Sequence, residues 1–289
     1  MVKTMKILIT GAKGQLGSEF KLLHNENLHF SFVDKNALDI CDLNAVLKAT
    51  QGFDALINCA AYTAVDEAEN ERGKAFAVNE TGALNLAKAC KKFGIKLIHI
   101  STDYVFNGKA YTLLDENAKT APLGVYGLSK LAGEKAILNE KLKACAIIRT
   151  SWLYGKEGKN FVKTIANLAT QKDELSVVCD QIGSPTNAKN LASAICELLP
   201  KLKDEKTQIF HYANEGVASW FDFACEIVRI LGASCKILPI KSSEYKSLAT
   251  RPFYSVLDKS KIKAHFDIQI PHWRESLAEF IKENIKDKK

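Results

Sequence analysis

The sequence predicts an α/β fold built on a doubly wound parallel sheet, with a smaller second lobe interleaved near the C-terminus. Three observations support this prediction. Short apolar runs alternate with helical patterns in the first half of the 289 residues, a glycine-rich turn follows the first run, and the rhythm loosens after about residue 150. Continuous apolar strands separated by helices are typical of a parallel sheet covered on both faces.

The first half contains five apolar runs with the length of buried strands. They lie at 6–10, 30–33, 55–58, 96–101 and 145–149. A helix is expected to begin near Gln15, and another helical pattern precedes Gly94. Because this order alternates strand and helix, each pair of neighbouring strands is expected to be parallel.

The second half has a looser pattern. Strands are expected at 175–178 and 208–211, with helices near 187–199 and 219–231 and a final amphipathic helix from Trp273. Five of the six prolines lie here, and no linker or repeat separates the halves. We therefore expect residues 1–150 to form one domain and 151–289 mainly a second lobe, with some segments returning to the first.

Composition excludes several classes of protein. Hydrophobic residues make up 47% and charged residues 25%, which is close to the globular average and unlike disordered or coiled-coil chains. The longest apolar runs fall far short of the roughly 20 residues that span a bilayer, and no signal peptide is visible. We expect a cytoplasmic protein that does not bind a membrane.

The net charge is +7, from 40 basic and 33 acidic residues, and part of the excess lies in the tail at 282–289. Without a basic stripe or a supporting motif, nucleic-acid binding is not expected. A modest basic excess instead suits a small anionic ligand.

Cysteine and histidine spacing gives no support for a metal site. The eight cysteines form no C-x-x-C pair, and most have apolar neighbours, so we expect buried free thiols in a reducing compartment. The six histidines form no H-E-x-x-H motif.

The turn after the first strand has the glycine spacing of a dinucleotide-binding Rossmann domain. Gly11 permits a tight turn, Gly14 lets the backbone approach a pyrophosphate, and Gly17 permits close packing of helix on strand. An acid, Asp34, ends the second strand. The strand, turn, helix and acid together predict that residues 1–150 bind NAD(P).

The choice between NADH and NADPH stays open. Asp34 would accept a hydrogen bond from a ribose hydroxyl, which favours NADH. Lys13 and Lys35 lie where a 2′-phosphate would be, which favours NADPH. Asp39 and Ile40 either flank the adenine or belong to an ordinary loop.

A second constellation carries acid–base chemistry. Thr102 follows the fourth strand, at the edge where open α/β sheets bind ligands. Tyr126 and Lys130 are four residues apart and share one helical face. A lysine ammonium is expected to lower the pKa of the phenol, so that Tyr126 acts as general acid toward a carbonyl oxygen held by Thr102. Glu134 is expected to pair with Lys130.

Longer strings resemble the extended, sugar-nucleotide branch of the short-chain dehydrogenase/reductase superfamily, and within it the dTDP-4-dehydrorhamnose reductase family. In order along the chain they are NCAAYTAVDEAE (58–69), STDYVF (101–106), YGLSKLAGE (126–134), RTSWLYG (149–155), DQIGSPT (180–186) and RPxxSxLD (251–258). The resemblance covers nearly the whole chain.

This resemblance implies NAD(P)H-dependent reduction of the 4-keto group of dTDP-4-dehydro-L-rhamnose to dTDP-L-rhamnose. Tyr126 would donate the proton, Lys130 would hold the cofactor ribose, and Thr102 would bind the reacting oxygen. The cofactor-binding segments of the family correspond to Gly14, Gln15, Leu16, Ala61, Tyr62 and Thr63.

The resemblance also suggests how the substrate is bound. Thr102 and Asp103 would contact the sugar, and Trp152 would pack on the substrate. Arg251 is either a diphosphate clamp or a structural ion pair, because guanidinium groups match both phosphate and carboxylate oxygens. Arg149, which lies in another of the family strings, is a further candidate for the diphosphate.

Several functional alternatives remain. Sugar-nucleotide dehydratases carry Thr-Asp-Glu after the fourth strand, but here the third position is Tyr104, which favours simple reduction. A reductase or epimerase of another nucleotide-linked 4-keto-6-deoxy sugar stays open. A non-catalytic, dinucleotide-binding regulator is disfavoured by the intact Thr102, Tyr126 and Lys130. Some family members dimerise through Mg²⁺, but the lysine-rich tail gives such a site no support, and both monomer and homodimer stay open.

Overall fold

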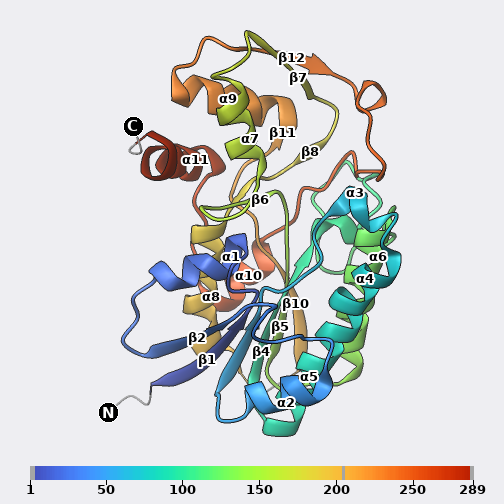
Figure 1. Ribbon diagram of the computed structural model, residues 1–289, viewed down its shortest axis with the longest axis vertical. Helices are drawn as coiled ribbons and strands as arrows, with labels where there is room; N and C mark the ends of the chain where they lie inside the picture. Colours follow the sequence, from blue (N-terminus) through green and yellow to red (C-terminus); the bar gives the residue numbers. More distant parts are fainter. Residues whose placement is uncertain (1–3, 204–205, 287–289) are drawn as a thin grey trace.

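The computed structural model describes residues 4–203 and 206–286. In this part of the chain a six-stranded parallel sheet has the order β10-β5-β4-β3-β1-β2 (Figure 1). Its strands are β1 (Met5–Thr10), β2 (Leu28–Val33), β3 (Ala55–Asn58), β4 (Lys96–Thr102), β5 (Cys145–Thr150) and β10 (Thr207–His211). The chain leaves β1 for β2 on one side, and β3 pairs on the other side of β1. Ligands of open α/β sheets bind at such a reversal.

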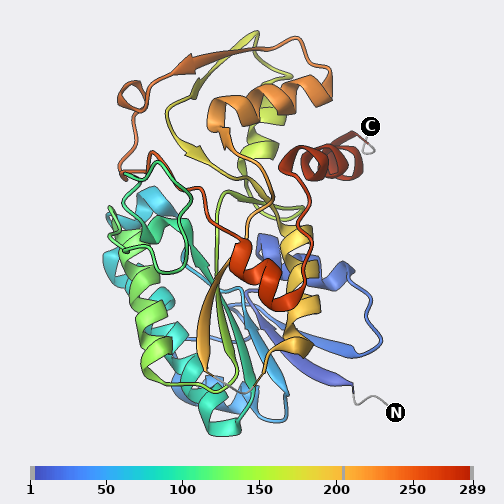
Figure 2. The same cartoon turned by 180° about the vertical axis from the view of Figure 1, so that it is seen from behind.

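Helices cover both faces of this sheet (Figures 1 and 2). One face carries α2 (Leu43–Thr50), α5 (Ala83–Phe93) and α6 (Val125–Asn139), and the other carries α1 (Gln15–Glu19), α8 (Ala188–Lys201) and α10 (Ser260–Phe266). Val46 and Leu86 belong to the core of the first face, whereas Leu191 and Ile262 belong to the core of the second. The doubly wound prediction is confirmed.

Shorter elements connect the helices and strands. They are the 3-10 helices η1 (Phe20–Leu22), η3 (Asp103–Val105) and η4 (Ser242–Glu244), the helices α3 (Val65–Ala68) and α4 (Arg72–Phe76), and the π-helices η2 (Ala77–Gly82) and η5 (Lys282–Lys286). The predicted first helix does begin at Gln15, but its α-helical part ends at Glu19.

The second lobe has its own hydrophobic core, around Phe223 and Trp273. Its elements are α7 (Phe161–Leu168), α9 (Trp220–Leu231), α11 (Trp273–Ile281) and the parallel pair of β7 (Glu174–Val178) with β12 (Lys236–Ile240). Two small ladders lie at its base: β6 (Leu153–Tyr154) with β9 (Thr186–Asn187), and β8 (Ile182–Gly183) with β11 (Ala218–Ser219). In Figure 1 this lobe lies above the carboxyl edge of the sheet.

The two halves are interleaved, as the sequence predicts. Strand β10 pairs with β5, and helices α8 and α10 pack in the core of the large sheet, although all three follow residue 150. Leu191 and Phe210 share this core with Ile7 because these late segments are themselves apolar. The chain therefore passes between sheet and lobe several times, which places lobe residues over the sheet edge. No helix in the described residues is long and apolar enough to cross a lipid bilayer.

Candidate active site

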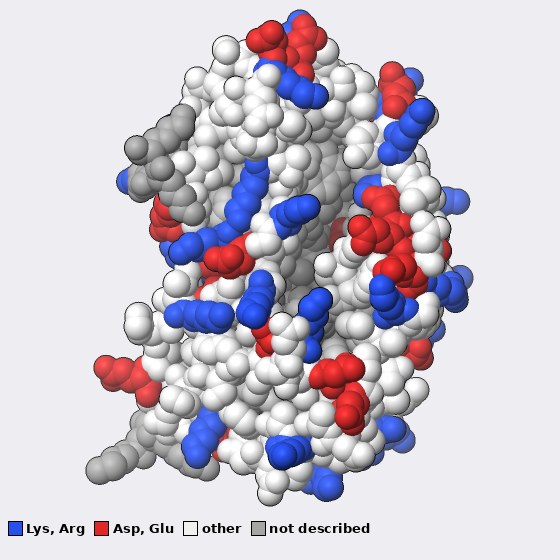
Figure 3. All heavy atoms as spheres, in the orientation of Figure 1, with Lys and Arg blue, Asp and Glu red and all other residues white. Residues whose placement is uncertain are grey.

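Two cavities meet at the carboxyl edge of the sheet. The central cavity has a volume of about 480 Å³ and is lined by Thr102, Tyr126 and Lys130 among others. The outer cavity, of about 550 Å³, is lined by Asp34 and Ile40 among others. Gly14, Cys59 and Ala61 line both, so the two cavities are adjacent. Figure 3 shows a hollow between lobe and sheet with lysine and arginine side chains along one rim.

In the glycine-rich turn, two glycines are closely packed and the third borders the cavities. Gly11 has φ +69°, and a Cβ there would lie 2.6 Å from the Ala60 nitrogen. A Cβ on Gly17 would lie 2.4 Å from the Gly11 oxygen, so Gly17 holds helix α1 against the turn. Gly14 instead borders both cavities, and Gln15 and Leu16 line the central one. Gly11 and Gly17 thus lie where a side chain would clash, and the approach of Gly14 to a pyrophosphate stays a prediction.

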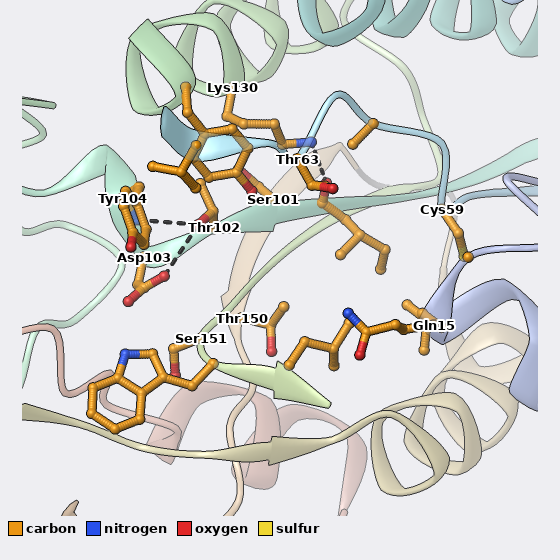
Figure 4. A pocket seen from close by; sticks show the side chains of 18 of the residues that line it. Gln15, Cys59, Thr63, Ser101, Thr102, Asp103, Tyr104, Lys130, Thr150 and Ser151 are labelled. Atoms are coloured by element: carbon orange, nitrogen blue, oxygen red, sulfur yellow. Dashed lines mark hydrogen bonds between the residues drawn. The ribbon is translucent and has the colours of Figure 1, made fainter. Parts of the chain in front are cut away.

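Gln15 shows that this turn is built to receive a polar group. Its side-chain Oε1 is buried and finds no hydrogen-bond partner among the described residues. Buried polar atoms are almost always hydrogen-bonded, so an orphaned one at a cavity wall marks a place for a ligand donor. Figure 4 shows the Gln15 side chain at this wall, across the cavity from Thr63 and Lys130.

The outer cavity brings together the residues that bear on cofactor choice. Asp34 forms an ion pair with Lys13 and accepts hydrogen bonds from the backbone nitrogens of Asn36 and Ala37, at 2.9 and 3.1 Å. The Lys13 hydrogen bond is the main reason why the pKa of Asp34 is lowered. Lys35 lines the same cavity. The features that favour NADH and NADPH therefore share one place.

The remaining predicted cofactor residues also line these cavities. Asp39 and Ile40 border the outer cavity, Thr63 the central one, and Ala61 both. Tyr62 borders the outer cavity and is fixed from behind, because its backbone nitrogen donates to Asn79 and its hydroxyl donates to Glu71.

Thr102 and Tyr126 form the reactive wall of the central cavity. Thr102 ends β4, and its hydroxyl donates to Asp103 at 3.1 Å and accepts from the Tyr104 nitrogen (Figure 4). Tyr126 lies in the first turn of α6. Burial raises the pKa of Tyr126 to about 12, although a hydrogen bond with Thr102 acts in the opposite direction. Tyr126 is thus a neutral phenol with a proton to give.

Lys130 lines the cavity one turn further along α6. Its Nζ donates to the Ile100 carbonyl oxygen at 2.7 Å and lies 3.5 Å from Nε2 of His99. Burial lowers the pKa of Lys130 to about 8, against the opposing influence of Glu134 and Cys59. The expectation that Lys130 lowers the pKa of Tyr126 is not met, because the ammonium turns toward β4.

Glu134 and Arg149 correct two sequence-based expectations. Glu134 does not pair directly with Lys130: it accepts a bidentate pair of hydrogen bonds from Arg149, at 2.7 and 2.9 Å, and a third from the Ser101 hydroxyl at 2.5 Å. Glu134 and Arg149 are only 1% and 2% exposed. Arg149 therefore forms a buried ion pair beneath the site and is not free to bind a diphosphate. The two residues meet because strand register sets Arg149 beside Ser101.

Asp103 faces the central cavity with an unsatisfied oxygen. It is 1% exposed, and its Oδ2 has no partner among the described residues. Burial raises the pKa of Asp103 to about 6, although hydrogen bonds from Ser255 and Thr102 lower it. Sequence reasoning did not single out Ser255 as a site residue, although it lies in the RPxxSxLD string.

Trp152 lines the central cavity in a strained backbone conformation. Its φ is +47°, in the left-handed region that bulky residues rarely adopt. Its ring stacks on Trp220, with centroids 3.6 Å apart and an interplanar angle of 8°. A Cβ on Gly183 would lie 2.6 Å from this indole. Strain held by surrounding contacts is typical of functional positions. Trp220 was missed because no local pattern links it to Trp152.

Arg251 lines a third cavity, the lobe cavity, of about 400 Å³, together with Trp220, Tyr245 and others. Its Nη2 pairs with Asp66 Oδ2 at 2.6 Å. Burial would raise the pKa of Asp66, but hydrogen bonds led by that from Arg251 lower it to about 2. The guanidinium is only partly covered, so Arg251 has an ion pair and also borders a cavity.

The described residues hold no group of three or more His, Cys, Asp or Glu side chains placed to bind a metal ion. Glu279 and Glu283 do lie together, but the ammonium of Lys189 contacts both, at 2.8 and 2.9 Å. All eight cysteines, each within the described ranges, are free thiols, as the sequence predicts, but only Cys90, Cys145 and Cys235 are fully buried and the other five are partly exposed.

Comparisons with known proteins agree with this geometry. The RmlD substrate binding domain family matches residues 5–285. Spore coat polysaccharide biosynthesis protein SpsK of Bacillus subtilis is 40% identical over 96% of this chain and 97% of its own. The dTDP-4-dehydrorhamnose reductase of Streptomyces griseus is 40% identical over 94% and 91%. The crystal structure of dTDP-4-dehydrorhamnose reductase from Bacillus anthracis in complex with NADP has a TM-score of 0.92 at 40% identity, over 97% of this chain and 99% of that one. The chain belongs to the RmlD substrate binding domain family.

Proposed function

We propose that this protein reduces the 4-keto group of dTDP-4-dehydro-L-rhamnose to give dTDP-L-rhamnose, using NADPH or NADH. One observation carries the proposal: Thr102, Tyr126 and Lys130 line a cavity that shares Gly14, Cys59 and Ala61 with the adjacent cavity at the glycine-rich turn. An acid–base group thus lies beside the place for a dinucleotide. Family members that are similar over nearly the full chain carry the same activity in their names.

The residues present fit a nicotinamide dinucleotide. The turn from Gly11 to Gly17 leaves Gly14 open to both cavities, and the orphaned Gln15 Oε1 faces the central one. Asp34, Lys13 and Lys35 would surround the adenosine ribose, with Asp39 and Ile40 nearby. When bound, the cofactor supplies a hydride.

Tyr126 would supply the proton for the same reduction. Reducing a ketone leaves a negative oxygen that must be protonated. Because burial keeps the pKa of Tyr126 at about 12, its hydroxyl is protonated at neutral pH and can donate. Thr102 is within hydrogen-bonding reach of Tyr126 and would hold the carbonyl oxygen. Lys130, one turn away, would hold the cofactor ribose.

The substrate would extend from the central cavity toward the lobe cavity. Asp103 would bind a sugar hydroxyl through its unsatisfied Oδ2, and Trp152 would pack on the sugar. The stacked pair Trp152 and Trp220 borders both cavities, since Trp152 lines one and Trp220 the other. Arg251, which lines the lobe cavity, would meet the diphosphate by exchanging Asp66 for phosphate oxygens.

The same proposal gives the chain a place in the cell. One relative is named for spore coat polysaccharide biosynthesis, which fits a product that serves as a deoxysugar donor for surface polysaccharide. We propose a cytoplasmic enzyme with a nicotinamide-binding domain at 1–150 and a mainly substrate-binding lobe at 151–289. It would act as a monomer or homodimer on a small molecule, without nucleic-acid or membrane partners.

Turnover with a panel of 4-keto sugar nucleotides tests the function. We expect loss of NADPH or NADH absorbance with dTDP-4-dehydro-L-rhamnose and formation of dTDP-L-rhamnose. Tyr126→Phe should lower kcat by about 10²- to 10⁴-fold while cofactor affinity is kept, because only the proton donor is removed. Preference for another sugar would reassign the substrate. Cofactor binding without turnover of any member would instead indicate a regulator.

A further inference from the structure

We propose that His99, buried behind the wall of the central cavity, is a positioning residue that presents an N–H to Lys130 and thereby sets the pH at which Lys130 loses its proton. The inference deepens the proposed reductase function and rests on it wherever turnover is the readout. The tautomer of His99, on which the inference depends, is deduced from hydrogen bonds within the protein and does not depend on the proposed reaction.

Asn58 fixes that tautomer. Its side-chain oxygen accepts from the Thr10 hydroxyl at 2.7 Å and from the Ala60 backbone nitrogen at 3.1 Å. A backbone N–H can only donate, so the amide oxygen must face it and the amide nitrogen must lie on the other side. That nitrogen lies 2.9 Å from Nδ1 of His99. His99 Nδ1 is therefore the acceptor.

The proton of His99 must then be on its other nitrogen. His99 is 1% exposed, and burial, together with the nearby Lys130 charge, lowers its pKa well below the usual value. A neutral imidazole carries one N–H, and with Nδ1 accepting, that N–H is at Nε2. Nε2 lies 3.5 Å from Nζ of Lys130. The ring thus offers Lys130 a hydrogen-bond donor and not a lone pair.

This contact disfavours the ammonium form of Lys130. An ammonium has only donors, so it cannot pair with an N–H, whereas a neutral amine can accept from it. The Ile100 carbonyl satisfies one Nζ proton at 2.7 Å. Glu134, on the same helix, and Cys59, which follows β3, act in the opposite direction and favour the ammonium. The oxygens of Glu134 are already engaged by Arg149 and Ser101.

Tyr126, one turn before Lys130 on α6, is neutral at working pH and adds no charge. Burial lowers the pKa of Lys130 to about 8, close to physiological pH. The His99 N–H, 3.5 Å from Nζ, acts in the same direction in our proposal. Since the proposed reaction uses a protonated Lys130, activity is expected to fall as the pH rises through that value. His99 would therefore help to set the pH at which activity falls on the alkaline side of the pH profile.

Two variants test whether the N–H of His99, and not simply the volume of its ring, controls the pKa of Lys130. His99→Asn puts an amide oxygen where Nδ1 was, so Asn58 keeps an acceptor, and it removes the N–H that faces Lys130. Asn58→Leu keeps the imidazole and removes the bond that fixes it, so His99 is free to turn a lone pair toward Lys130. Both changes should raise the pKa of Lys130 by about one unit. Ile98→Val, on the same strand, is the matched control and should leave it unchanged.

The readouts are chosen to act independently of turnover. Nitrogen-15 NMR of histidine-labelled, cofactor-free protein should show His99 protonated at Nε2 and unprotonated at Nδ1 throughout the neutral range. Carbon-13 NMR of labelled lysine should give the Lys130 titration, with its signal assigned by Lys130→Arg. In turnover, the alkaline limb of kcat/KM should move upward in both variants, in step with the NMR titration.

A His99 protonated at Nδ1 would overturn the proposal. So would a Lys130 titration that neither variant changes. If neither variant folds, the tautomer in the unmutated chain decides. If no 4-keto sugar nucleotide is turned over, the proposed function fails, and the two NMR titrations still decide the role of His99.

Discussion

The wall of the central cavity and the cluster directly beneath it treat polar groups in opposite ways. Glu134 and Arg149 lie beneath the wall, and together with Ser101, which also lines the cavity, they satisfy one another with short hydrogen bonds. On the wall, Gln15 Oε1 and Asp103 Oδ2 are buried and unpartnered among the described residues. The two sets meet within one sequence motif, because Ser101 and Asp103 are two residues apart. A motif therefore mixes residues that complete the fold with residues that await a ligand, and hydrogen-bond satisfaction tells them apart.

The largest expected effect concerns the satisfied cluster. Arg149→Met should destabilise the protein by about 3–5 kcal/mol, because it leaves the Glu134 carboxylate buried without its counter-ion. The double variant Arg149→Met with Glu134→Leu should recover most of that loss, since buried pairs are often replaceable by apolar groups. Urea unfolding measures both. If the double variant loses as much unfolding free energy as the single variant, the loss does not come from an unpaired Glu134 carboxylate. The Glu134–Arg149 pair would then itself contribute net stability.

The next effect concerns the unsatisfied wall. The pKa of Asp103 is raised to about 6, above an unfolded value near 3.8, so the protein loses stability as the pH rises from about 4 to 6, and the full cost remains above that range. Asp103→Asn should thus stabilise the protein at neutral pH by roughly 2–3 kcal/mol. The gain should shrink as the pH falls from 6 toward 4, because the Asp103 carboxyl of the unfolded chain then becomes protonated as well.

Thermal or urea unfolding across that pH range tests the sign. A stability difference that does not change with pH would show that Asp103 is ionised and solvated in the folded protein. The same variant should lose substrate affinity, since its unsatisfied oxygen is the proposed sugar contact. A gain in stability with a loss of function is the pattern expected where an unsatisfied polar group serves a ligand.

A smaller effect is expected at the tryptophan pair, which extends the wall toward the lobe. Trp220→Leu removes the ring on which Trp152 stacks, and such aromatic contacts are worth about 0.5–1.5 kcal/mol beyond burial. We expect kcat/KM for the sugar nucleotide to fall by up to about tenfold, with unchanged cofactor affinity. Phe221→Leu, the next residue on α9, is the control. Equal losses in both would assign the effect to lobe stability.

The strands were predictable because of where they lie. A parallel strand buried on both faces is largely apolar, so the ends of an apolar run such as Ala55–Asn58 coincide with the ends of the strand. The wall residues were predictable for a related reason: Thr102 ends a strand and Tyr126 begins a helix, and both ends meet at the same sheet edge. In this fold, strand-end position and motif spacing are enough to assemble most of the reactive wall.

The satisfied cluster was not predictable from local spacing. Glu134 follows Lys130 by one helical turn and was expected to pair with it, but the register of β4 with β5 brings Arg149 closer. The contact of Asn58 with His99 also joins two strands, β3 and β4, and depends on their register. Contacts of this kind depend on tertiary packing, which local periodicity does not encode.

The smallest expected effect lies at the outer cavity, where a charged side chain is both paired and exposed to solvent. Lys13 pairs with Asp34 yet is itself largely exposed, so it is available to a 2′-phosphate. Lys13→Ala should lower kcat/KM for NADPH relative to NADH by up to about fivefold, because exposed charge pairs are worth about 0.2–1 kcal/mol. Lys92→Ala, on the exposed side of α5, is the control. The change should fade at high salt, because solvent-exposed charges are screened. An equal fall for both cofactors would mean that Lys13 serves only to hold Asp34, and that the open side of the outer cavity does not read the phosphate.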